Sequence, residues 1–177
     1  MRLFIALTLP EGVARTVTAL QRSLQFGHEV PRENLHLTLA FLGERAEAEL
    51  GAVGEALENL PLYPVDLALS GVETLGRAAS PVLAAGVKPS EPLKALEARL
   101  LTRLRREGLD LPRRRFHPHV TIARGLTPAD APKLAAALAA MPPFATDPFR
   151  PETLALFRSR LGGPAPVYEE LGSIPMP

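Results

Sequence analysis

The chain has 177 residues, a formal net charge of +1, 46% hydrophobic and 22% charged residues, and no cysteine. These values are typical of one globular domain, and they exclude disulfides, thiolate nucleophiles and cysteine-based zinc sites. No segment has the length and apolar character of a membrane span, and the start MRLFIALTLPEG predicts a strand rather than a signal peptide. We therefore expect a cytoplasmic protein that does not enter a membrane.

Strands and helices alternate along the first sixty residues. Apolar residues recur at helical spacing at Val13, Val17, Leu20 and Leu24, whereas the strands are short apolar runs. The predicted order is strand, helix, strand and helix, over residues 2–8, 11–26, 35–42 and 44–60.

The rest of the chain repeats this order and then adds strands. We expect strands over 63–72 and 81–87, a helix over 91–107, a strand over 119–124 and a helix over 128–141. Two more strands are expected within 148–174, with the turn between them at Gly162, Gly163 and Pro164. On the helix over 91–107, Arg99, Arg103 and Arg106 lie opposite the leucines and are expected to face solvent.

The same short motif occurs in the second strand of each repeat. It is His36-Leu37-Thr38-Leu39 in the first repeat and His119-Val120-Thr121-Ile122 in the second. Two copies of one supersecondary unit predict two similar lobes that face each other.

The motif places polar side chains on one face of its strand. Residues i and i+2 of a strand point to the same side, so His36 shares a face with Thr38, and His119 with Thr121. A neutral and a protonated histidine can together serve as general base and general acid near neutral pH. Threonine hydroxyls can donate hydrogen bonds to phosphate oxygens, and the whole set suits the hydrolysis of a phosphodiester.

Three segments resemble those of the two-histidine (2H) phosphoesterases, and within them the RNA 2′,3′-cyclic phosphodiesterases, also called 2′-5′ RNA ligases. The segments are RLFIAL at the start, NLHLTLAFLGE around the first motif and FHPHVTIAR around the second. The resemblance implies an α+β fold for the whole chain, 1–177. It is a single bilobal domain with pseudo-twofold internal duplication, in which two antiparallel sheets flanked by helices enclose a central cleft.

The resemblance also implies roles for five residues. His36 corresponds to the proton donor and His119 to the proton acceptor, while Thr38, Thr121 and Arg124 correspond to groups that bind the phosphate. The implied reaction converts RNA 2′,3′-cyclic phosphate ends to 2′-phosphates, with no metal and no cofactor. Its reversal would join RNA ends through a 2′-5′ bond.

Two other functions keep the same cleft. One is an enzyme acting on small cyclic phosphates, such as ADP-ribose cyclic phosphate, or on 2′-5′ oligonucleotides. The other is a module that binds RNA ends without catalysis, although binding alone needs no acid–base pair. The implied partner is RNA with cyclic phosphate ends, tRNA fragments among them, and the expected state is a monomer.

Several residues near the motifs have two interpretations each. Phe41, which lies five residues past its motif histidine as Arg124 does, either packs in the core beside Leu39 or stacks on a base. His117 is expected as an exposed residue at the start of a strand, with contact to substrate or half of an HxH metal site as alternatives. The Arg113, Arg114 and Arg115 run either attracts an RNA backbone or forms a solvated loop. His28, in a polar loop, is given no role.

Overall fold

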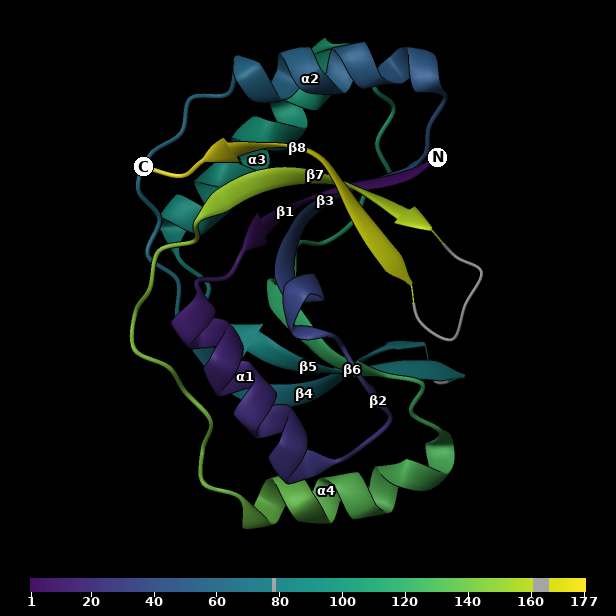
Figure 1. Ribbon diagram of the computed structural model, residues 1–177, viewed down its shortest axis with the longest axis vertical. Coiled ribbons are helices and arrows are strands. Elements are labelled where there is room, and N and C mark those ends of the chain that lie inside the picture. The colour runs from purple at the N-terminus through teal and green to yellow at the C-terminus, as the bar shows by residue number, and fades with distance from the viewer. Residues whose placement is uncertain (78, 161–165) are drawn as a thin grey trace.

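The structure is a computed structural model that describes residues 1–77, 79–160 and 166–177 (Figure 1). The expected turn at Gly162, Gly163 and Pro164 lies outside the described residues. The helices are α1 (Glu11–Leu24), α2 (Leu50–Glu58), α3 (Glu91–Arg106) and α4 (Ala131–Ala140). The strands are β1 (Arg2–Thr8), β2 (His28–Glu29), β3 (His36–Glu44), β4 (Leu69–Arg77), β5 (Ser80–Val87), β6 (His119–Arg124), β7 (Thr153–Arg160) and β8 (Val167–Pro175).

The strands are antiparallel and follow the order β4-β5-β6-β3-β1-β7-β8, with β2 paired to β6. At the centre of this order β3 pairs with β6 at one position, Leu37 with Val120. Figure 1 shows the strands diverging from this junction into two sheets, one above and one below. The predicted α+β fold is confirmed, with an antiparallel sheet flanked by four helices.

The first helix of each repeat packs on the lobe that contains the strands of the other repeat. Helix α1 follows β1 but contacts β6, and α3 follows β5 but packs beside α2 and contacts β3 (Figure 1). The buried Gln21 side chain attaches α1 to its lobe. Its amide nitrogen donates to the carbonyl oxygens of Val30 (2.8 Å) and Ile122 (2.7 Å). Each lobe is therefore built from both repeats.

Helix α3 shows how the sequence pattern becomes a packed helix. The Ser90 hydroxyl accepts a hydrogen bond from the Leu93 backbone nitrogen (3.4 Å) and so caps the first turn. Its leucines at intervals of three and four form a stripe that is completely buried: Leu93, Leu96, Leu100 and Leu104. Arg99 and Arg103, expected to face solvent, are instead half-buried. The Arg103 guanidinium donates to the Asn59 carbonyl (3.1 Å), and Arg99 lies over the Tyr63 ring.

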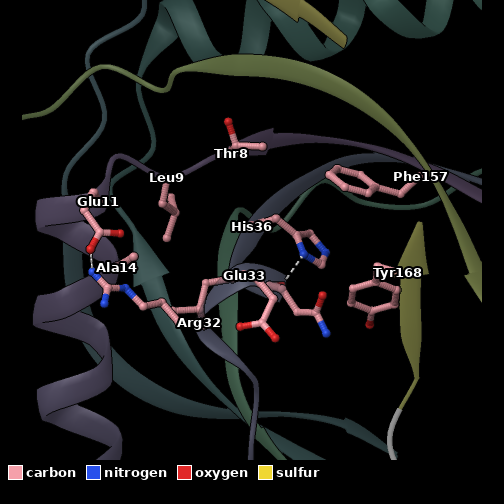
Figure 2. A pocket seen from close by; sticks show the side chains of 11 residues that line it. Thr8, Leu9, Glu11, Ala14, Arg32, Glu33, His36, Phe157 and Tyr168 are labelled. Carbon is pink, nitrogen blue, oxygen red and sulfur yellow. Dashed lines mark hydrogen bonds and ion pairs between the residues drawn. The ribbon is translucent and has the colours of Figure 1, made fainter. Parts of the chain in front are cut away.

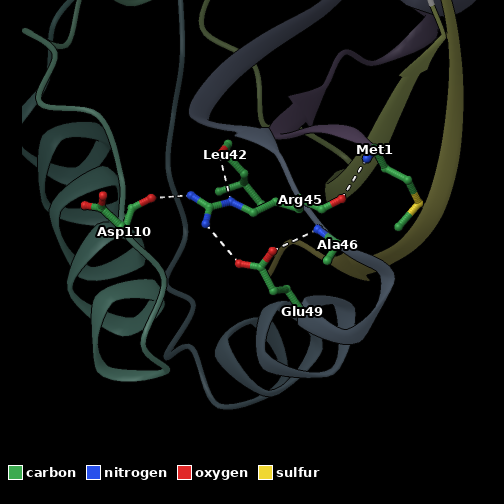
Figure 3. Close-up of polar contacts among 6 residues, drawn as sticks. All are labelled: Met1, Leu42, Arg45, Ala46, Glu49 and Asp110. Carbon is green, nitrogen blue, oxygen red and sulfur yellow. Dashed lines mark hydrogen bonds and ion pairs between the residues drawn. The ribbon is translucent and has the colours of Figure 1, made fainter.

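The helix predicted from residue 44 begins later than expected. Strand β3 runs to Glu44, and α2 begins at Leu50 after a short 3-10 turn over Glu47–Glu49. At this corner Arg45 is bonded to four neighbours (Figure 3). Its guanidinium donates to the Leu42 carbonyl, the Glu49 carboxylate and the Asp110 carbonyl, and its own carbonyl accepts from the amino terminus.

The strand predicted over 63–72 is displaced toward the C-terminus. Residues 63–66 form no strand, Leu67 forms an isolated bridge with Phe149, and β4 spans Leu69–Arg77. The proline at position 64 supplies no backbone N–H, which disfavours a ladder there. Gly71, at φ +77°, accommodates a bulge, beyond which β4 forms a hairpin with β5. This pairing, rather than apolar alternation, sets the length of β4.

In the part of the chain that the structure describes, no helix has the length and hydropathy of a membrane span.

The bonds of Gln21 predict a measurable stabilisation. Gln21→Ala removes two buried hydrogen bonds, of which the one to Val30 leaves its carbonyl without the side-chain donor, while the Ile122 carbonyl keeps the bond from the Val30 backbone nitrogen (2.9 Å). We therefore expect the free energy of unfolding to fall by about 1–3 kcal/mol. Urea unfolding followed by circular dichroism measures this change. Arg22→Ala, on the exposed face of the same helix, is the control and should change stability by less than about 0.5 kcal/mol. Equal unfolding midpoints for both variants would show that Gln21 does not anchor α1.

Candidate active site

The motif side chains meet where the two sheets join. Leu37 and Val120, the paired residues, are completely buried. Their neighbours along each strand point to the opposite face, which lines a cavity of about 280 Å³ between the lobes. Every site residue predicted from the sequence lines this cavity: His36, Thr38, His119, Thr121 and Arg124.

The antiparallel register arranges the two motifs crosswise. Because Leu37 lies opposite Val120, His36 falls on the side of Thr121 and Thr38 on the side of His119. The two histidines thus occupy one diagonal of the junction and the two threonines the other. Side chains on such a diagonal are typically about 7–8 Å apart, which leaves room for a phosphoryl group.

Both histidines are oriented by the same backbone bond. The Nδ1 atom of His36 lies 2.7 Å from the Asn34 carbonyl oxygen, and Nδ1 of His119 lies 2.7 Å from the His117 carbonyl oxygen. A carbonyl oxygen can only accept a hydrogen bond, so each Nδ1 carries a proton. In each ring Nε2 is therefore the nitrogen that can take up or release a proton.

His36 lies in an aromatic environment that the sequence did not reveal. Its ring stacks on Phe4 (centroids 4.9 Å apart) and meets the edge of Tyr168 (5.3 Å), with Phe157 slightly farther away (6.1 Å). Figure 2 shows His36 next to Phe157 and Tyr168, with the bond from its ring to the Asn34 carbonyl. Burial lowers the pKa of His36 to about 4, and the positive charge of Arg124 adds to this effect. Without a ligand, His36 is neutral at pH 7.

Arg124 connects the two lobes across the cavity. It lies on β6, and its guanidinium donates to the Tyr168 hydroxyl of β8 (3.1 Å). Tyr168 also lines the cavity. Sequence reasoning missed Tyr168 and Phe157 because neither belongs to a repeated motif, and their contacts depend on the pairing of distant strands.

A β-bulge in each motif strand turns one further residue toward the cavity. On β3, Thr38 pairs with Ala6 and Ala40 pairs with the preceding residue of β1, so Leu39 is an extra residue. On β6 the pairing to β5 shifts in the same way between positions 121 and 123. One extra residue reverses the alternation of faces, so the fifth residue after each motif histidine faces the cavity.

Phe41 is such a residue, and the interpretation that it packs in the core beside Leu39 is wrong. Its side chain is 47% exposed and lines the cavity. The Arg114 guanidinium lies 5.3 Å from the centre of its ring. Simple alternation from Leu37 and Leu39 places Phe41 in the core, whereas the bulge places it in the cleft.

His117 and His28 are held by partners from distant segments. The Nε2 atom of the exposed His117 lies 2.7 Å from a carboxylate oxygen of Glu73 on β4, which sequence proximity could not indicate. His28, expected in a loop, lies in β2 and pairs with Arg124. The Arg113, Arg114 and Arg115 run is exposed in the loop before β6. Among the described residues, no three His, Cys, Asp or Glu side chains are grouped as metal ligands would be.

A second cavity, of about 320 Å³, lies on the other side of His36 (Figure 2). It shares His36 and Tyr168 with the first cavity. Its wall includes an ion pair between Arg32 and Glu11, which ties the short turn before β3 to helix α1. His36 therefore borders both cavities.

Comparison with known proteins identifies the family. The model of the 2′-5′ RNA ligase superfamily matches residues 9–163. A Geobacillus stearothermophilus protein named RNA 2′,3′-cyclic phosphodiesterase is 32% identical over 180 residues, which cover 98% of this chain and 56% of that protein. This chain thus spans little more than half the length of that relative. A Thermus thermophilus protein of the same name is 35% identical over 186 residues, covering 97% of this chain and 88% of the relative.

Solved structures agree with this assignment. A crystal structure of a Thermus thermophilus protein superposes with a TM-score of 0.79 at 30% identity, covering 99% of this chain and 98% of the other. Unliganded LigT of Escherichia coli superposes with a TM-score of 0.79 at 25% identity, covering 99% and 96%. The paired motifs, the antiparallel fold and these matches lead to one conclusion: the chain belongs to the 2′-5′ RNA ligase superfamily, whose members are two-histidine phosphoesterases.

Proposed function

We propose that this protein hydrolyses 2′,3′-cyclic phosphate ends of RNA to 2′-phosphates, with His36 and His119 as the acid–base pair. The observation that carries the proposal is the crosswise arrangement at the Leu37–Val120 junction. In-line displacement at phosphorus requires the attacking and leaving oxygens on opposite sides, and the histidine diagonal offers a proton-transfer group on each side. The names of the Geobacillus and Thermus relatives support the same reaction.

The reaction needs one proton transfer at each side of the phosphorus. Water attacks the phosphorus while Nε2 of His119 takes its proton, and the bond from phosphorus to the ribose 3′ oxygen breaks. Nε2 of His36 donates its proton to that oxygen, which leaves as a hydroxyl, and the phosphate remains on the 2′ oxygen. The hydroxyls of Thr38 and Thr121, with the guanidinium of Arg124, bind the non-bridging oxygens. Attack by a 5′-hydroxyl in place of water, with the same break of the bond from phosphorus to the 3′ oxygen, would instead join two RNA ends through a 2′-5′ bond.

The pKa of His36 constrains this assignment. A proton donor must be protonated before the reaction, yet burial lowers the pKa of His36 to about 4 in the unliganded site. A bound cyclic phosphate brings a negative charge that offsets Arg124 and favours the protonated ring. We therefore propose that substrate binding raises the pKa of His36 and so causes the ring to take up the proton that it later donates.

The site is proposed to work without a metal ion. Its polar groups are imidazoles, hydroxyls and a guanidinium, whereas Mg²⁺ and Ca²⁺ prefer clusters of carboxylate and carbonyl oxygens. Arg124 and the hydrogen-bond donors offset the negative charge of the phosphate, which is the task that a metal ion would otherwise perform.

Product analysis tests the proposal directly. An oligonucleotide with a 2′,3′-cyclic phosphate end should yield the 2′-phosphate, at the same rate with and without EDTA. Chromatography against authentic 2′- and 3′-phosphate standards identifies the product. Activity that disappears in EDTA and returns with added metal would disprove metal independence. A protein that binds the oligonucleotide without turnover would instead be a binding module.

Titration of His36 by NMR tests whether the phosphate loads the proton. In the free protein the His36 ring signals should titrate with a pKa of about 4, because burial opposes the charge. With a nucleoside 2′-phosphate bound, the pKa should rise by about one to three units, as expected for an opposite charge nearby. His36→Asn identifies the signals. An unchanged pKa in the complex would contradict the loading step.

Substituting each histidine in turn shows which of the two is the proton donor and which is the proton acceptor. His36→Ala and His119→Ala should each lower kcat by about 10²–10⁴-fold. A substrate with a more acidic leaving alcohol should partly restore His36→Ala but not His119→Ala, because only the former lacks a proton for the leaving oxygen. If the more acidic leaving alcohol instead restored the rate of His119→Ala, then His119 would be the proton donor and His36 the proton acceptor. Wild-type rates from both variants would exclude a two-histidine mechanism.

A further inference from the structure

A groove along helix α3 has no task in the proposed chemistry. It encloses about 420 Å³, more than either cavity beside His36, and it lies where α3 packs beside the end of α2 (Figure 1). Three of its lining residues are arginines, and none is acidic. The lining residues are Asn59, Leu60 and Pro61 at the end of α2, and Ala98, Arg99, Thr102, Arg103 and Arg106 on α3.

In the described part of the chain, the arginines of the groove have no anionic partner. The ion pairs there involve other basic groups, and none includes Arg99, Arg103 or Arg106. Arg103 donates to the Asn59 carbonyl, and Arg99 lies over the exposed ring of Tyr63. The whole chain has a formal charge of only +1, so the groove is a local concentration of positive charge.

Two of these guanidinium groups retain unused hydrogen-bond donors. The Nε atoms of Arg99 and Arg103 are shielded from solvent, and neither has a hydrogen-bond partner among the described residues. A buried N–H group without an acceptor is unfavourable. The fork of Nε and a terminal nitrogen matches two oxygens of a phosphate. A phosphate in the groove, met by a rotation of these flexible side chains, would supply the missing acceptors.

The arginines form one stripe along the helix. Arg99, Arg103 and Arg106 are separated by four and three residues, which places them on the same side of α3. At a rise of about 1.5 Å per residue, the stripe is about 10 Å long. Phosphates of one strand follow each other every 3.4 Å or so along a double helix, so the stripe is long enough for two or more of them. A polynucleotide backbone therefore fits the groove better than a single phosphate ion.

The opposite flank of α3 forms a wall beside the cleft. Glu97 and Leu101 line a cavity of about 200 Å³ that also includes Thr38 and His119. Residues two apart on a helix point about 200° away from each other, so Arg99 faces the other flank. A helix with its side chains is about 10–12 Å wide, which makes the groove and the cleft about one helix width apart. An RNA strand that ends between the histidines can span this distance with a few nucleotides.

We propose that Arg99, Arg103 and Arg106 bind the sugar–phosphate backbone of the RNA substrate, a few nucleotides away from its cyclic phosphate end. The inference rests on the proposed function, because the end of the strand must lie between the histidines. It also narrows the substrate class. A strand long enough to reach the groove gains affinity, whereas a mononucleotide or a small cyclic phosphate gains none. Contacts to phosphates do not read bases, so RNA of any sequence is accepted.

A length series of substrates tests the groove. The series runs from adenosine 2′,3′-cyclic phosphate to unstructured RNAs of about 12 nucleotides with the same end, a length typical of single-strand binding sites. In the wild-type protein kcat/KM should rise with length and then level off. The triple variant Arg99→Gln, Arg103→Gln and Arg106→Gln should lower the ratio of kcat/KM for the longest RNA to that for the mononucleotide by about 5- to 50-fold, as the loss of three partly exposed ion pairs predicts.

A matched control removes the same charge elsewhere. Arg15 and Arg22 are exposed on α1, and Lys133 is exposed on α4. The triple variant Arg15→Gln, Arg22→Gln and Lys133→Gln also loses three positive charges and should keep the wild-type ratio. Equal effects of the two triple variants would indicate general charge attraction and would overturn the proposal.

A single variant guards against misfolding, because Arg99 and Arg103 also contact the protein. Arg106 is exposed, so Arg106→Glu should keep the wild-type unfolding midpoint in urea. The same variant should lower the substrate ratio by about 3- to 10-fold, since it replaces an attraction for phosphate by a repulsion. A folded Arg106→Glu protein with the wild-type ratio would contradict the proposal.

A binding measurement tests the groove without turnover. Fluorescence anisotropy gives the Kd of a labelled RNA that ends in a 2′-phosphate, at several salt concentrations. The slope of log Kd against log salt reports the phosphate contacts, at about 0.7 per contact on a single strand, so the groove variant should lose about one to two units of slope. The matched control should keep the wild-type slope.

The outcomes separate the two proposals. If the wild-type protein hydrolyses no member of the series, the proposed function is wrong, and the salt dependence of binding still decides whether the groove holds RNA. If the protein hydrolyses the series at a kcat/KM that does not depend on length, the groove proposal is overturned. A groove variant with the wild-type ratio or the wild-type salt slope overturns it as well.

Discussion

The contact between Leu37 and Val120 is the constraint on which the cleft depends. This buried pair joins two sheets that diverge on both sides of it. Because the pair fills the core side, the neighbouring histidines and threonines must face the opposite side. A longer ladder between β3 and β6 would close the cleft, and loss of the pair would separate the two motifs. A small apolar contact thus sets the spacing of the polar groups.

The aromatic environment of His36 has both a structural and an electrostatic effect. Phe4, Phe157 and Tyr168 fix the ring, and the same burial disfavours its charged form. His119 lies on the other lobe, where its ring is near that of His117. The two motifs are alike in sequence and in their backbone bonds, but their surroundings differ. In a pseudo-symmetric site, such differences are what can assign opposite tasks to equivalent residues.

Much of the fold and most of the site followed from local patterns. The two motif strands, the four helices and the histidines and threonines that line the cleft were predicted, because strand alternation and helical spacing are properties of short segments. Arg124 was named only through the family resemblance. The predictions that failed concern features that depend on pairing between strands distant in the sequence. Phe41 was misplaced because a bulge in β3 is visible only against its partner β1. The strand after position 63 was misplaced because its length is set by the hairpin with β5. Tyr168 was missed because its role arises from contact with Arg124 of the other lobe.

The exchange of helices between the repeats has a consequence for how the chain reaches its native state. Each repeat covers part of the other, since α1 contacts β6 of the second repeat and α3 contacts β3 of the first. Strand β1 also gains its second neighbouring strand only when β7, 145 residues later in the sequence, is present. Contacts so distant in sequence slow folding. During synthesis, a ribosome-bound chain lacking its last strands has no enclosed His36. The enclosure of His36 needs Phe4 of β1, Phe157 of β7 and Tyr168 of β8 together, so it forms only after β7 and β8 have been translated.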